Sequence, residues 1–233
     1  MRIGITRDAH QLEELNDKAL ERGIEVVSVP LITIRQIPFE WPPRLSTDSP
    51  NWVLFSSAAG VSAFLDSLQK LAVTLPSSVC YAAIGEKTAA AIRACGLKVS
   101  YVPSEAYGEV LFAEFIEKVV RENEIVMYVR AADVACDPAP LFAERGIDYI
   151  PLVCYATVNR GIDPDIINGF DATDYLLFTA PSAVRSYHEQ FGKPRMHAVA
   201  IGRTTGGEME RQGWSGYTSL PTPDINRILE LVK

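Results

Sequence analysis

Hydroxyl and arginine side chains recur where apolar runs end in this 233-residue sequence. An apolar run that ends in such residues and leads into an amphipathic segment is typical of a strand, a tight turn and a helix N-terminus. That turn presents unpaired backbone N–H groups and a positive dipole end, which together can bind an anion. The candidate anion-binding side chains are Arg7, Ser56, Ser57, Thr88, Arg130, Thr179, Ser182 and Thr205.

Each of these side chains also has an ordinary explanation, as a helix N-cap or a solvated arginine. Tyr155, in the run LVCYATV, has two interpretations as well. It either packs at a strand end with its hydroxyl bonded to a carbonyl, or it acts chemically. A phenol with a pKa near 10 is protonated at neutral pH and can donate its proton to a departing hydroxyl. The residues alone leave both interpretations open.

An internal repeat connects these positions. The stretch WVLFSSAAGV at 52–61 returns as YLLFTAPSAV at 175–184, which is 123 residues later. Ile125–Arg130 repeats Ile3–Arg7 at the same spacing, as ERGI at 144–147 repeats ERGI at 21–24. AIGEKT at 83–88 returns as AIGRTT at 200–205, 117 residues later. The pattern predicts a duplicated α/β fold of the doubly wound parallel class.

Ligands of such sheets bind outside the carboxyl ends of the strands, where the candidate residues lie. The proline-bearing connections that follow the second strand of each half, from Thr33 and from 158–164, would let the chain cross between domains. The segment 38–50 carries further prolines and is typical of a crossing linker. If the two sheets face each other, the hydroxyls and arginines of both halves would converge on one interdomain cleft.

The amino-acid composition argues against two classes of binding partner. A net charge of -7 and a pI near 5.1 argue against binding to nucleic acid or to an anionic membrane, because both require a basic surface. The N-terminus MRIGITRDAH lacks the apolar core of a signal peptide, and no apolar run approaches the roughly 18 residues of a membrane helix. We therefore expect a cytoplasmic protein. We also expect a monomer, although no motif in the sequence reveals the oligomeric state.

No motif for a metal or a nucleotide is present. The four cysteines, Cys80, Cys95, Cys136 and Cys154, have no metal-ligand spacing, and all but Cys136 lie in apolar context that predicts buried thiols. The three histidines are scattered and have no partner motif. No GxGxxG or P-loop lysine motif follows a strand, which argues against a dinucleotide or nucleoside triphosphate site.

The motifs ITR, LFSSAAGV, AIGEKTAAAI, ERGIDYIPLVCYATV, LFTAPSAV and AIGRTT occur in this order, and with them the chain resembles the uroporphyrinogen-III synthase family over essentially its whole length. The resemblance implies two flavodoxin-like α/β domains joined by a two-stranded linker. Domain 1 would comprise residues 1–35 and 160–233, and domain 2 residues 36–159 with the linker strands at its ends.

The resemblance also implies the chemistry. Hydroxymethylbilane, a linear tetrapyrrole with many carboxylates, would lose water and close to uroporphyrinogen III with its last ring inverted, without metal or organic cofactor. Tyr155 would assist loss of the hydroxyl. The candidate side chains, with the turn residues Ala58 and Pro181, would bind the carboxylates. One departure is the run AADVACDPAP after Arg130, where the family usually carries Gly and a second Arg. The alternative is a non-catalytic two-domain module that closes on a tetrapyrrole or another polyanion such as a sugar phosphate.

Overall fold

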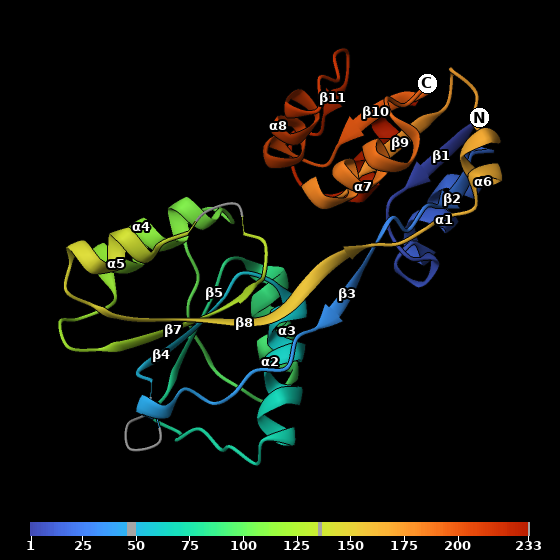
Figure 1. Ribbon diagram of the computed structural model, residues 1–233. Coiled ribbons are helices and arrows are strands. Elements are labelled where there is room, and N and C mark those ends of the chain that lie inside the picture. The colour runs from blue at the N-terminus through green and yellow to red at the C-terminus, as the bar shows by residue number, and fades with distance from the viewer. Residues whose placement is uncertain (46–49, 135–136, 233) are drawn as a thin grey trace. The chain divides into compact units, whose positions relative to one another are not determined.

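The structure is a computed structural model that describes residues 1–45, 50–134 and 137–232. The chain forms two compact units, one made of Met1–Thr33 with Val158–Lys233 and the other of Ile34–Thr157. Each unit is a mainly parallel sheet with helices on both faces (Figure 1). The predicted α/β class with parallel sheets is therefore confirmed. Cys136 lies outside the described residues, as do residues 46–49 of the segment predicted to be a linker.

The first unit contains a five-stranded sheet in the order β11-β10-β9-β1-β2, in which every pair is parallel. Its strands are β1 (Arg2–Ile5), β2 (Glu25–Ser28), β9 (Tyr175–Phe178), β10 (His197–Ala200) and β11 (Thr218–Ser219). Its helices are α1 (Glu13–Leu20), α6 (Pro164–Asn168), α7 (Pro181–Phe191) and α8 (Arg203–Arg211), with 3-10 turns at Ala9–Gln11 and Ile225–Glu230.

The second unit contains the sheet β3-β8-β7-β4-β5-β6. Its strands are β3 (Ile32–Gln36), β4 (Trp52–Phe55), β5 (Cys80–Ala83), β6 (Val99–Tyr101), β7 (Ile125–Ala131) and β8 (Asp148–Asn159). Its helices are α2 (Ala58–Lys70), α3 (Glu86–Ala94), α4 (Gly108–Lys118) and α5 (Ala139–Glu144), with a 3-10 turn at Pro43–Leu45.

Apolar residues on both sides of the central strands explain why both faces are covered, as expected for parallel sheets. In β4, Val53 and Phe55 pack with α2 and α3, whereas Trp52 and Leu54 pack with α4 and α5. Figure 1 shows α4 with α5, and α2 with α3, as separate groups about this sheet. In the first unit α7 and α8 cover one face, and α1 covers the other.

The strand registers of the two units correspond. In the first unit Ile3 pairs with Val26 on one side and with Tyr175 on the other. In the second unit Val126 pairs with Tyr149 and with Trp52. Each of these residues lies 123 positions from its counterpart, the spacing of the sequence repeat. The β4–β5 and β9–β10 pairings also correspond, with β5 and β10 offset by 117.

The chain passes from the first unit to the second within β3 and returns within β8. The backbone N–H of Ile37 donates to the carbonyl of Cys154 at 2.8 Å, and that of Arg160 donates to the carbonyl of Leu31 at 2.9 Å. The two strands therefore run antiparallel. The described residues of the segment 38–50 follow this crossing and belong to the second unit, where Phe39 and Trp41 pack on the core.

The prediction of buried thiols is wrong for Cys95. Cys154 is buried and Cys80 is half-buried, but Cys95 is exposed. Cys95 is the C-cap residue of α3, just before the left-handed Gly96, so the helix has already turned away from the core there. Within residues 1–45, 50–134 and 137–232, no helix is both long enough and apolar enough to cross a membrane.

Candidate active site

Some of the predicted residues lie at or just after the carboxyl ends of the two strands between which the strand order of each sheet reverses. In the second unit the strand order reverses between β7 and β4, and Arg130 and Ser56–Ala58 stand at the ends of these strands. In the first unit the reversal falls between β1 and β9, which end at Ile5 and Phe178, shortly before Arg7 and Thr179. Such a reversal leaves a crevice beyond the strand ends, where doubly wound sheets bind ligands.

Tyr155 and Ser57 form the closest side-chain contact among the predicted residues. Ser57 Oγ and Tyr155 Oη are 2.6 Å apart, although the residues are 98 positions apart in the chain. Ser57 is the N-cap of α2, and its Oγ accepts the backbone N–H of Gly60 at 3.0 Å. The phenol is thus connected through one hydroxyl to the positive end of a helix.

A β-bulge in β8 places Tyr155 on the face of the sheet that α2 covers. Arg130 pairs with Val153, but Ala131 pairs with Tyr155, so β8 has one extra residue. Strict alternation would direct Tyr155 and Cys154 to opposite faces, yet both belong to the core cluster beneath α2. Bulges redirect side chains in this way and are over-represented beside active sites. β8 also continues to Asn159, so Tyr155 lies within the strand rather than at its end.

The surroundings of Tyr155 favour a protonated phenol. The residue is 5% exposed. Burial raises the pKa of Tyr155 above its usual value of 10.0, while the hydrogen bond with Ser57 opposes this shift. A neutral phenol at neutral pH can act as a general acid, and the hydroxyl beside it can stabilise the phenolate that remains.

Arg130 is the cationic residue of β7 and lies one position before the end of that strand. Its side chain is half-buried, and its Nε is buried with no hydrogen-bond partner in the part of the chain that the structure describes. A buried guanidinium N–H without an acceptor costs free energy, which an anionic ligand could recover. Arg130 therefore combines a position at the strand reversal with unused donor capacity.

In the first unit the strand ends are joined by threonines. The backbone N–H of Thr179 donates to Thr6 Oγ1 at 2.9 Å, and Thr179 Oγ1 donates to the Thr6 carbonyl at 3.1 Å. Arg7 follows Thr6, and burial lowers the pKa of its guanidinium from the usual value. Thr179 is thus engaged in joining β1 to β9, which the sequence did not indicate.

The remaining predicted residues occupy helix starts. Ala58 and Pro181 are the first residues of α2 and α7, and Ser56 and Ser182 are half-buried beside them. Thr88 and Thr205 lie in the first turns of α3 and α8, with only 4% and 3% of their surfaces exposed. These two threonines contribute more to helix packing than to an accessible surface.

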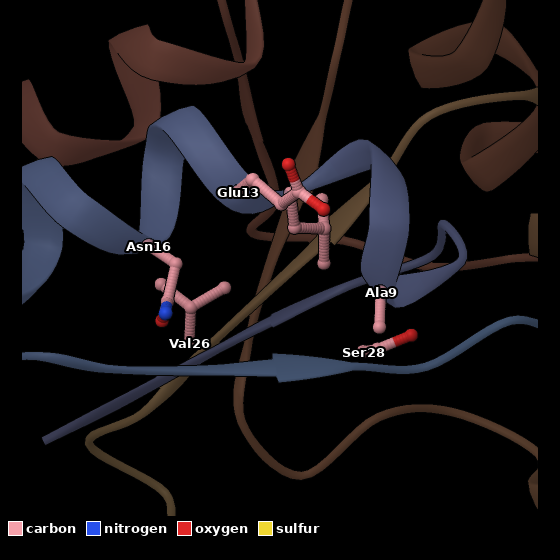
Figure 2. A pocket seen from close by; sticks show the side chains of 6 residues that line it. Ala9, Glu13, Asn16, Val26 and Ser28 are labelled. Carbon is pink, nitrogen blue, oxygen red and sulfur yellow. The ribbon is translucent and has the colours of Figure 1, made fainter.

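A small open pocket in the first unit lies elsewhere. Figure 2 shows Glu13 and Asn16 of α1 above Val26 and Ser28 of β2. No predicted site residue lines this pocket. Among the described residues, no group of three or more His, Cys, Asp or Glu side chains could hold a metal ion.

Comparison with known proteins identifies the family. A family model described as uroporphyrinogen-III synthase HemD matches residues 13–230. The chain belongs to the uroporphyrinogen-III synthase family. A curated relative named uroporphyrinogen-III synthase, from Chlorobaculum parvum, is 25% identical over 223 residues, which cover 90% of this chain and 88% of the relative.

Two solved structures have a similar fold. The uroporphyrinogen-III synthetase of Helicobacter pylori matches with a TM-score of 0.67 at 22% identity, covering 99% of this chain and 98% of the other. A mutant uroporphyrinogen III synthase of Thermus thermophilus matches with a TM-score of 0.63 at 17% identity, covering 99% and 96%. Uroporphyrinogen-III synthases are cyclising lyases of heme biosynthesis, so the chain belongs to a family of enzymes.

Two residues of this candidate site were missed from the sequence. Gly60 lies against both Ser57 and Tyr155, and Thr6 bonds to Thr179. The repeat could have indicated Gly60, because its counterpart 123 positions later is Ala183. Nothing in the sequence distinguished Thr6 from an ordinary strand-end threonine.

Proposed function

We propose that this chain converts hydroxymethylbilane into uroporphyrinogen III, with Tyr155 as the acid that assists loss of the hydroxyl. The family match over residues 13–230 carries the overall reaction. The contact between Tyr155 Oη and the helix-capping Ser57 Oγ supports the specific role of the phenol. The match favours an enzyme over a non-catalytic binding module, and no observation in the described residues favours the module.

The reaction proceeds in three balanced steps. The C–O bond of the hydroxymethyl group breaks with its electron pair on oxygen, and the Tyr155 proton converts the departing hydroxide into water. The α-carbon of the last pyrrole ring that already carries the neighbouring bridge bonds to the freed methylene carbon. The bond from that α-carbon to the neighbouring bridge then breaks, and the bridge carbon bonds to the other α-carbon of the ring, which closes the macrocycle with that ring inverted. The proton released at ring closure returns to the phenolate. The net change is the loss of one water, so no oxidant, reductant or cofactor is required.

Carboxylate binding is assigned to the two strand reversals. Arg130, with its unpartnered Nε, and the N-terminal amides of α2 are the donors in the second unit. Arg7 and the start of α7 at Pro181–Ser182 are the corresponding groups in the first. Ser56 and Thr179 contribute to carboxylate binding through their backbone amides. Thr88 and Thr205 contribute indirectly, because they pack the first turns of α3 and α8.

We also propose that the two units are flavodoxin-like domains that arose by duplication. If the second unit is counted from β7 and its edge strand β3 is left aside, both sheets have the order 2-1-3-4-5, which is the flavodoxin order. The repeated spacing of 123 in the strand registers supports this origin. The acidic charge supports the absence of a nucleic-acid partner, and the metabolic role of the family supports a cytoplasmic location.

The test is ring closure of hydroxymethylbilane scored by isomer. The purified chain should yield uroporphyrinogen III faster than the uninverted isomer forms spontaneously. If only the uninverted isomer accumulates, the proposed function fails. Tight binding of uroporphyrinogen without turnover would support the binding module instead.

A further inference from the structure

Helices α2 and α7 begin with the same backbone turn in the two halves of the sequence repeat, but only the N-cap of α2 carries a hydroxyl. Ser57, the N-cap of α2, has φ -161 and ψ 154, and its side chain accepts an N–H. Ala180, 123 residues later, is the N-cap of α7 with φ -158 and ψ 153 and has no side-chain cap. The backbone turn therefore forms without the serine, so the turn itself does not explain why position 57 has a hydroxyl.

Two further positions differ together with Ser57. Gly60 corresponds to Ala183, and Tyr155 corresponds to Ile32. A Cβ on Gly60 would lie 3.3 Å from Tyr155 Cε1 and 3.3 Å from Ser57 Oγ, closer than such atoms usually approach. The first turn of α2 thus has a glycine where the tyrosine ring needs space, and a serine where the phenol needs a partner.

Either hydroxyl can donate in the hydrogen bond between Ser57 and Tyr155. The Gly60 N–H donates to Ser57 Oγ at 3.0 Å, so the hydroxyl proton of Ser57 remains available for Tyr155 at 2.6 Å. When Ser57 donates, Tyr155 Oη is an acceptor, and the phenol proton is left for another group. After that proton departs, the same bond stabilises the phenolate and connects it to the helix N-terminus.

We propose that Ser57 is a positioning residue that directs the Tyr155 proton toward the substrate and stabilises the phenolate, and that Gly60 provides the space for the ring. This inference rests on the proposed function, since it assigns a role within the same reaction. It differs from the sequence prediction, which treated Ser57 as a carboxylate ligand. A carboxylate ligand would affect substrate affinity, whereas a positioning residue affects the chemical step.

The experiment compares Ser57→Ala and Ser57→Thr in the full chain, with Ser62→Ala as the matched control. Ser62 lies on the same helix but is exposed. Ser57→Ala should lower kcat about 10- to 100-fold with KM within about threefold, because a hydrogen bond to a developing charge is lost. Ser57→Thr should retain most of kcat, and Ser62→Ala should behave as the parent does. Gly60→Ala should lower kcat as well, since the ring must shift.

Two readouts separate positioning from structure. Without Ser57 the opposing hydrogen bond is gone, so the pKa of Tyr155 should rise and the alkaline limb of the kcat profile should move to higher pH. In a Tyr155→Phe background, Ser57→Ala should change kcat by less than about twofold, because the two residues act as one unit.

Some outcomes would overturn the inference. A Ser57→Ala kcat within threefold of the parent, a rise in KM alone, or multiplicative losses in the double variant would each do so. Failure of the proposed function is a different result, because the parent chain itself would then form no uroporphyrinogen III.

Discussion

Glu208 is the most buried acidic side chain with arginine partners among the described residues, and its replacement should destabilise the first unit. Its side chain is 5% exposed. Oε2 accepts from Arg185 Nη1 at 3.2 Å and from Arg211 Nη2 at 2.8 Å, and Oε1 accepts from Gln212 Nε2 at 2.9 Å. Glu208→Gln keeps the volume but presents an NH₂ group to one of these donors.

The loss of stability expected for Glu208→Gln can be estimated from the burial of the groups involved. Breaking a fully buried ion pair costs about 3–5 kcal/mol. Arg185 and Arg211 are 38% and 66% exposed, so water can solvate them after the change, and one amide oxygen remains as an acceptor. We therefore expect Glu208→Gln to cost about 2 kcal/mol, which increases the opening equilibrium constant of the unit roughly 30-fold.

The loss of stability caused by Glu208→Gln should depend on pH. Burial alone would raise the pKa of Glu208, but hydrogen bonds from Gln212 and Arg211 and the charges of Arg185 and Arg211 outweigh it and lower the pKa from 4.5. A carboxyl whose pKa is lower in the folded state stabilises above its unfolded pKa and loses this effect as pH falls through the folded value. The difference between the parent and Glu208→Gln should therefore narrow in acid.

The assay is hydrogen exchange of amides in β9 and α8, read by mass spectrometry in the full chain. Glu230→Gln is the matched control, because Glu230 accepts from Arg227 at 3.2 Å but is 63% exposed. The control should change exchange by less than about 0.5 kcal/mol. A Glu208→Gln effect no larger than the control, or one that does not depend on pH, would refute the reasoning.

Two further predictions concern an acidic group and a helix cap. Hydrogen bonds from Ser104 and Tyr101 lower the pKa of Glu114 to about 2, so its stabilising effect should persist down to pH 4.5 and disappear as pH falls toward 2. NMR titration of the Glu114 carboxyl measures this pKa, and a value near 4.5 would contradict it. Ala180→Ser should stabilise α7 by about 0.5–1 kcal/mol, since Ala180 has the N-cap backbone of Ser57. Slower exchange at the start of α7 would support this, and unchanged exchange would count against it.

Much of the fold was predictable because it depends on local pattern. Apolar runs such as 52–55 and 175–178 are buried strands, and the hydroxyl-rich turns after them begin helices as predicted. The alternation of strand-like and helix-like segments was enough to predict parallel sheets. The predicted domain boundaries, 1–35 with 160–233 and 36–159, remain predictions. They lie close to the bounds of the two compact units.

The contacts of the site were not predictable because they depend on one irregular step in a strand. Regular alternation along β8 would direct Tyr155 away from α2, and only the bulge after Val153 brings it to Ser57. No sequence rule predicts a parallel bulge at a particular residue. The hydrogen bonds between Thr6 and Thr179 likewise depend on the pairing of two chain segments that are 173 positions apart.

Tyr155→Phe tests the central claim most directly. The substitution keeps the ring in the core and leaves Ser57 bonded to the Gly60 N–H. Tyr81→Phe is the matched control, because Tyr81 is buried in the same core cluster. We predict that Tyr155→Phe lowers kcat for uroporphyrinogen III formation at least about tenfold while Tyr81→Phe stays within about twofold. A loss below about threefold for Tyr155→Phe would contradict the assignment of this phenol as the acid.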